Sequence, residues 1–289
     1  MDLLCGEVTP DHEEVDMNRS PKYNQENIVG TTKAAEDNNV LKDNRALNHL
    51  LCSESRYIPK CVFASYRRNG AEVEPHMRKI LTNWMLEVCE ELRCEEVVFP
   101  LAINYIDRLM SCTKIRKCQL QLVGAVCLLI ASKLRQCDAL TPDVLSYFTD
   151  YSVTTQEILG WELLVLARLK WDVSAVVATD FLNHLLVRLE LNNEEDNEST
   201  IKNRNMKTII RRHASTFIAL CATELQFACH SPSLVACASI ATAMHGLDLL
   251  QTQWKSFDKI VFNLREITGI EETKIHSCVD QIESLIKAS

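Results

Sequence analysis

The sequence predicts an all-α protein built from two tandem five-helix domains. Helix-forming residues dominate, Gly and Pro occur only 7 times each in 289 residues, and apolar residues recur mainly at spacings of three and four. At about 100 to 200 residues per domain, the length suggests two domains. Two apolar segments, LVGAVCLLIA from Leu122 and LVACASIATA from Leu234, align without a gap, which indicates an internal repeat.

Both repeated segments are apolar on nearly every side of a helix. A helix of this kind has to be surrounded by other helices, so each half of the chain is expected to wrap several helices around a central one.

Residues 1–40 are expected to form a flexible arm. Most of this stretch is polar, with two prolines, scattered acids and few large apolar residues, so it cannot bury enough surface to offset the entropy of ordering. The arm is followed by a first domain with a preceding helix, residues 41–175, and by a second domain, residues 176–289.

Prolines indicate where many helices begin, because proline is tolerated in a first helical turn and not in the interior. The acidic, Asn-rich stretch from Leu191 to Asn205 is predicted to be a solvated loop. The predicted helices are 41–57, 75–93, 100–111, 116–135, 141–149, 154–171, 178–190, 205–223, 231–246, 253–266 and 271–287.

Composition excludes several classes of function. The formal charge of −8 and the pI near 5.6 argue against nucleic acid or an anionic membrane as a partner. The uncharged run from Leu120 to Ser132 falls short of the roughly 18 residues of a membrane helix. The acidic N-terminus does not resemble a secretory signal, so the protein is expected in the reducing interior of the cell.

No cofactor, metal site or catalytic group is expected. The 13 cysteines include no C-x-x-C pair and are irregularly spaced, so they are interpreted as small buried apolar residues. The sequence also lacks the G-x-G-x-x-G, P-loop and G-x-S-x-G patterns.

The segment HMRKILTNWMLEV after Pro75 carries one apolar face. Helical periodicity puts five residues on it: Met77, Ile80, Leu81, Trp84 and Val88. Such a stripe is more often core than binding site, and periodicity does not show whether it faces inward or outward.

Four segments, MRKILTNWMLEVCEE, FPLAINYIDRLM, LQLVGAVCLLIASKLRQ and LGWELLVLARLKWDV, resemble the cyclin box in order and spacing. With HASTFIALCATELQFACHSPSLVACASIA, the chain is most similar to D-type cyclins over nearly its whole length. The resemblance implies two cyclin-box domains. It also implies a regulatory subunit that binds and allosterically activates a G1 cyclin-dependent serine/threonine kinase and promotes the G1/S transition.

The resemblance assigns roles to individual residues. It implies that Lys133 and Glu162 grip the kinase near its regulatory helix, and that Arg78 and Asp107 form an ion pair between two helices. It also implies a cleft for Arg-x-Leu peptides of substrates and inhibitors, with Lys79 at a variable position that shifts peptide preference. The cleft residues are Met77, Ile80, Leu81, Trp84 and Gln121, with Glu87 as the acid that pairs with the peptide's arginine.

Residues 3–7 spell LLCGE, an L-x-C-x-E pattern at Leu3, Cys5 and Glu7. D-type cyclins carry this motif at their start and use it to bind retinoblastoma-family pocket proteins. In an extended peptide these three side chains point to one side, so they can enter adjacent pockets of a partner. A nuclear and cytoplasmic location is expected, with nuclear import through a partner, because no basic cluster resembles a strong import signal.

Two alternatives remain at the level of sequence. A transcription factor built on the same helical repeat would carry a basic surface and often a zinc ribbon, which the charge and the cysteine spacing disfavour. The other is an adaptor that binds pocket proteins without activating a kinase. D-type cyclins usually continue into an acidic tail with a phosphorylated Thr-Pro; this sequence ends at Ser289, so the resemblance is not extended to that signal.

Overall fold

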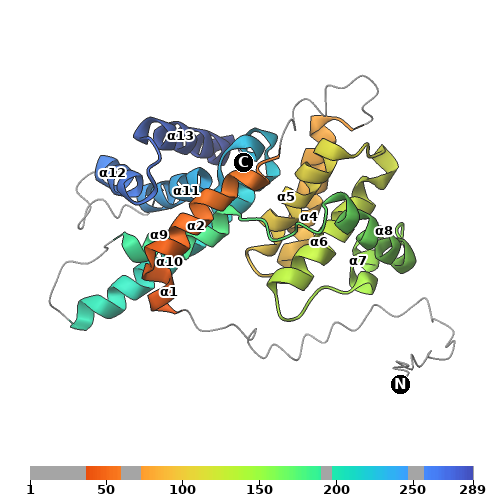
Figure 1. The fold of residues 1–289 in the computed structure, drawn as a ribbon, viewed down its shortest axis with the longest axis horizontal. Helices are drawn as coiled ribbons and strands as arrows, with labels where there is room; N and C mark the ends of the chain where they lie inside the picture. The colour runs from red at the N-terminus through yellow and green to blue at the C-terminus, as the bar shows by residue number, and fades with distance from the viewer. Residues whose placement is uncertain (1–36, 60–72, 190–196, 247–256, 289) are drawn as a thin grey trace. The chain divides into compact units, whose positions relative to one another are not determined.

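The computed structural model describes residues 37–59, 73–189, 197–246 and 257–288, with the backbone alone for 197–205. These residues form helices and contain no β-strand, so the predicted all-α class is confirmed (Figure 1). The motif residues Leu3, Cys5 and Glu7, and nearly all of the predicted arm, lie outside them.

The first repeat consists of five helices, four of which surround the fifth, α6. The central helix α6, Leu120–Arg135, contacts all four others and is buried continuously from Leu122 to Ser132. The surrounding helices are α4 (Pro75–Glu91), α5 (Val98–Cys112), α7 (Pro142–Phe148) and α8 (Thr155–Arg168).

The second repeat has the same organisation around α11, Pro232–Gly246, which is buried from Val235 to Met244. Its neighbours are α9 (Ala178–Arg188), α10 (Asn197–Thr223), α12 (Phe257–Thr268) and α13 (Glu272–Ala288). Both segments that the internal match identified are therefore the central helices of their repeats.

With its 3-10 turn at Lys117–Gln119, α6 is long and apolar enough to span a membrane by length and composition alone, but 67% of that span is buried inside the fold. Helix α6 therefore lies where the core helix of a helical bundle lies.

Most helix ends lie within four residues of the predicted ones, and two segments differ more from the prediction. The predicted helix 41–57 breaks into α1 (Asn38–Lys42), α2 (Asn44–Glu54) and a 3-10 turn, because Asp43 is extended and its carboxylate accepts the backbone N–H of Arg45 at 2.8 Å. The predicted loop 191–205 is wrong over residues 197–205, where α10 has already begun. Propagating a helix from a packed segment costs little, even through residues of modest helix propensity.

Helix α2 contacts α9 and α11 of the second repeat (Figure 1). The buried Glu54 carboxylate accepts hydrogen bonds from the backbone N–H of Ser233 at 2.8 Å and from its hydroxyl at 2.7 Å, in the first turn of α11. Burial raises the pKa of Glu54, partly offset by these bonds.

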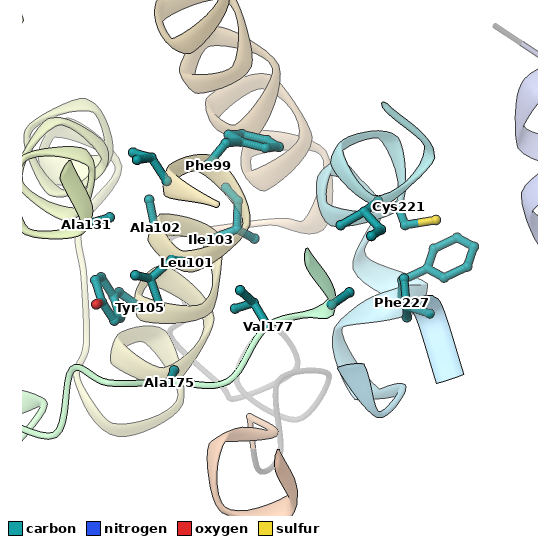
Figure 2. Close-up of a cluster of buried hydrophobic side chains, with 14 of the residues drawn as sticks. Phe99, Leu101, Ala102, Ile103, Tyr105, Ala131, Ala175, Val177, Cys221 and Phe227 are labelled. Carbon is teal, nitrogen blue, oxygen red and sulfur yellow. The ribbon is translucent and has the colours of Figure 1, made fainter. Parts of the chain in front are cut away.

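The apolar core continues from α5 through the connecting segment after α8 into the second repeat. Figure 2 shows Ile103 of α5, Val177 of the connection, and Cys221 and Phe227 of the second repeat in one group of buried side chains. The Tyr105 hydroxyl donates to the carbonyl of Val173 at 2.5 Å, which attaches the connection to α5.

Candidate functional site

The apolar stripe of α4 divides between core and surface. Leu81 and Val88 are buried, Met77 and Trp84 are half-buried, and the Ile80 side chain is 66% exposed. Pro75 occupies the first helical turn, where its missing N–H is harmless. One edge of the stripe therefore faces solvent, while Leu81, predicted as part of the cleft, lies beneath it in the core.

The Trp84 ring is fixed between α4, α6 and α7. Its indole N–H donates to the carbonyl of Phe148 at 3.2 Å. A Cβ placed on Gly124 of α6 would lie 2.9 Å from Cδ1 of Leu81 and 3.3 Å from the Trp84 ring. The glycine thus permits a close approach of α6 to the two side chains that shape this surface.

The remaining predicted cleft residues lie on the same two helices. Glu87 is exposed, three residues after Trp84 on α4. Gln121 is half-buried in the first turn of α6 and accepts a hydrogen bond from the Ser152 hydroxyl at 3.3 Å. We call Met77, Ile80, Trp84, Glu87 and Gln121 the α4 patch, an apolar surface with one acid and one amide.

Lys133 and Glu162 form an ion pair, although 29 residues separate them. The Lys133 ammonium, in the last turn of α6, donates to both carboxylate oxygens of Glu162 on α8 at 2.7 and 2.9 Å. The Lys133 side chain is 46% exposed and that of Glu162 is 15% exposed. The structure therefore brings together two residues that the sequence placed on separate helices.

Exposed leucines flank this ion pair, and the sequence analysis missed them. Leu159 and Leu163 lie on α8 within one turn of Glu162, and Leu134 follows Lys133. Their signal was available: the buried face of α8 carries Ile158 and Val165, so Leu159 and Leu163 fall outside it. We call Lys133, Leu134, Leu159, Glu162 and Leu163 the α6/α8 face.

Arg78 and Asp107 are almost completely buried and joined by two hydrogen bonds of 2.7 Å. Arg78 also donates to the carbonyl of Thr223 at 3.0 Å and to that of Ala222 at 3.2 Å, at the end of α10. The N–H groups of the planar guanidinium thus find acceptors on several sides, and these hydrogen bonds connect α4 and α5 to the second repeat.

Lys79 is also held by the second repeat. Its ammonium donates to the Thr223 hydroxyl at 2.8 Å and pairs with the carboxylate of Glu224. In the described structure this side chain therefore points to the end of α10.

No cluster of three or more potential metal-binding side chains occurs within the described residues. Of the eleven cysteines in the described residues, Cys94 is half-buried and five are buried: Cys89, Cys127, Cys221, Cys237 and Cys278. The interpretation of the cysteines as buried apolar residues is wrong for the five that are exposed, Cys52, Cys112, Cys118, Cys137 and Cys229. Burial raises the pKa of Cys237 and of Cys278 to about 12, so both thiols stay protonated at neutral pH.

Both repeats match known domain families. Residues 45–174 match the family "Cyclin, N-terminal domain", and residues 176–289 match "Cyclin, C-terminal domain". The chain is 45% identical to G1/S-specific cyclin-D3 of Homo sapiens over 257 residues, covering 89% of this chain and 82% of that protein. It is 40% identical to G1/S-specific cyclin-D2 of Gallus gallus over 287 residues, covering 99% and 87%.

Solved structures give the same fold. A viral cyclin from herpesvirus saimiri matches with a TM-score of 0.71 and 27% identity, covering 84% of this chain and 97% of that one. A chain of the CAK complex of Chaetomium thermophilum matches with a TM-score of 0.52 at 12% identity, covering 87% and 81%, which indicates a shared fold alone. By its two matched domains and its curated relatives, the chain belongs to the cyclin family and is a D-type cyclin.

Proposed function

We propose that this cyclin is the regulatory subunit of a G1 cyclin-dependent serine/threonine kinase, which it binds through the α6/α8 face. The observation that carries the proposal is the Lys133–Glu162 pair surrounded by exposed leucines. Burying a fully exposed leucine contributes about 1.5–3 kcal/mol, and each of these leucines, 43% to 64% exposed, would contribute a corresponding fraction. The two charged groups can form bonds to the partner's backbone and side chains, which orient it.

Activation then follows from selection of a kinase conformation. A rigid helical face that binds only the state with the regulatory helix turned inward shifts the kinase population toward that state. In that state the kinase Glu pairs with the Lys that anchors ATP. The phosphoryl transfer belongs to the kinase, and the cyclin supplies binding energy and orientation.

The α4 patch is proposed to dock Arg-x-Leu segments of substrates and inhibitors. The leucine of such a segment would cover Ile80 and the edge of Trp84, while its arginine pairs with Glu87. Leu81 would support this surface from the core. Because only one leucine and one arginine are bound, the affinity of the α4 patch for such a segment would be low. The ion pair would fix the orientation of the segment, which suits recruitment of a substrate.

Leu3, Cys5 and Glu7 are proposed to bind a retinoblastoma-family pocket protein in an extended conformation. Because the motif is joined to the helical repeats by a polar segment of about 30 residues, binding would raise the local substrate concentration without changing the active site. We propose that the protein acts in the nucleus as well as the cytoplasm, because this role requires access to the pocket protein.

The experiment is to purify the full chain with individual G1 cyclin-dependent kinases and to measure phosphorylation of a pocket-protein fragment. We expect a stable heterodimer and a large stimulation. Deletion of residues 1–8 should reduce phosphorylation of that fragment and leave an unrelated peptide substrate unaffected. A chain that binds the pocket protein but stimulates no kinase would be a non-activating adaptor, and one that binds nucleic acid instead would be a transcription factor.

A further inference from the structure

Helix α4 ends in a Schellman turn. Arg93 adopts a left-handed conformation with φ of 49°, its N–H donates to the carbonyl of Glu90 at 3.1 Å, and the N–H of Cys94 donates to that of Cys89 at 2.9 Å. In this turn the residues joined by the bond that spans five positions, Cys89 and Cys94, come close enough for their side chains to make contact. Here both are cysteines, so the turn places their thiols next to each other, and each thiol shifts the pKa of the other.

The same turn occurs elsewhere without a thiol pair. After α7, the N–H of Tyr151 donates to the carbonyl of Ser146 at 3.0 Å. After α8, the N–H of Trp171 donates to the carbonyl of Leu166 at 2.9 Å. The backbone motif thus recurs, and its side chains differ. At the end of α4 they are two groups that can react with each other.

Neighbouring contacts hold this turn from two sides. The N–H of Glu95 donates to the side-chain oxygen of Gln136, just after α6, at 3.2 Å. Glu96 pairs with Arg211 of α10 at 2.8 Å. These contacts hold the two residues that follow Cys94, and the backbone bond from Cys94 to Cys89 keeps the two cysteines close, as a disulfide with Cα atoms about 4.4–6.8 Å apart requires.

The two thiols differ in exposure and acidity. Cys89 is buried, whereas Cys94 is half-buried and is the one that a small oxidant in solvent reaches first. The interaction with the Cys89 thiol lowers the pKa of Cys94, and the same interaction together with burial raises the pKa of Cys89. Cys94 is therefore the better nucleophile of the two.

We propose that Cys89 and Cys94 form a peroxide-sensitive dithiol site that closes to an intrachain disulfide. The Cys94 thiolate attacks one oxygen of hydrogen peroxide, the O–O bond breaks, and the released hydroxide takes a proton to become water, leaving a sulfenic acid on Cys94. The Cys89 sulfur then attacks the Cys94 sulfur, its proton leaves with the sulfenic hydroxyl as a second water, and the S–S bond forms. A thiol reductant reverses the reaction by exchange.

The test treats the full chain with rising concentrations of hydrogen peroxide, blocks remaining thiols by alkylation, and digests the product with trypsin. Cleavage after Arg93 separates the two cysteines into peptides 80–93 and 94–108. We expect mass spectrometry to find these peptides linked, and separated after reduction, at peroxide concentrations that leave the exposed Cys118 unmodified.

Two variants make the result specific. Cys94→Ala should abolish the linked peptides and protect Cys89 from oxidation, while Cys118→Ala, which removes an exposed thiol outside the pair, should leave the linkage unchanged. Oxidation of Cys118 before any linkage appears, or sulfinic acid on Cys94 with no bond to Cys89, would overturn the proposal. Neither outcome depends on kinase binding, so the site is tested separately from the proposed function.

Discussion

Arg78 and Asp107 form a buried, doubly hydrogen-bonded ion pair whose guanidinium also holds two carbonyls at the end of α10. One side chain thus connects the first two helices of one repeat to the other repeat. Removing one partner leaves a buried charge without its counterion, which is far more costly than losing an exposed pair.

Arg78→Ala is therefore expected to lower the free energy of unfolding by about 3–5 kcal/mol in urea denaturation. The matched control is Arg265→Ala, which removes an exposed pair with Glu272 at 3.0 Å and should change stability by about 0–1 kcal/mol. Equal effects for the two variants would show that the Arg78 network does not hold the repeats together.

Gly124→Ala tests the close approach of α6 to α4. The added methyl would lie 2.9 Å from Leu81 and must displace it or Trp84, so we expect destabilisation of about 1–3 kcal/mol and altered Trp fluorescence. Gly160→Ala in α8 has nothing within 4 Å of its added methyl and should stabilise by about 0.5–1 kcal/mol. Stabilisation by Gly124→Ala would contradict the packing described for the α4 patch.

The Glu54 carboxyl predicts a specific pH dependence. Because its pKa is raised in the folded protein, the folded state binds this proton more tightly than the unfolded state. The stability of the wild type relative to Glu54→Gln should therefore be greatest below the unfolded pKa of about 4.3 and should fall as the pH rises through the folded pKa. Thermal denaturation of both proteins from acid to neutral pH measures this difference in stability. A relative stability of the wild type that increases with pH would contradict a raised pKa of Glu54.

Ile80→Ser separates docking from folding. The Ile80 side chain is 66% exposed, so its loss should leave the melting temperature nearly unchanged. We expect Arg-x-Leu peptide affinity to fall about 5- to 10-fold, roughly 1–1.4 kcal/mol, with kinase binding unaffected. Val88→Ala, on the buried part of the same stripe, should instead reduce stability; fluorescence anisotropy and thermal denaturation distinguish the two. Unchanged peptide affinity for Ile80→Ser would remove this residue from the docking surface.

The sequence predicted the helices whose position depends mainly on the pattern of apolar residues. The central helices α6 and α11 were found because a helix apolar on all sides needs neighbours, and prolines gave the starts of α4, α7 and α11. The break at Asp43 and the early start of α10 were missed because they depend on one capping bond and on propagation from a packed segment.

The candidate sites divide in the same way. Periodicity identified the α4 stripe, but only packing shows that Leu81 is inside and Ile80 outside. Resemblance named Lys133 and Glu162, whereas their direct ion pair joins two residues 29 positions apart on different helices and has no local signal. The carbonyl partners of Arg78 come from a separation of more than 140 residues, beyond any spacing rule.

The central claim is that the α6/α8 face binds and activates the kinase. Lys133→Glu reverses the charge of a side chain that is 46% exposed, so folding and α4 patch peptide binding should be preserved. Co-purification with a G1 cyclin-dependent kinase and kinase stimulation should both be lost, while Lys114→Glu, the same charge reversal at an exposed lysine after α5, should retain both. Undiminished co-purification and stimulation by Lys133→Glu would contradict the account.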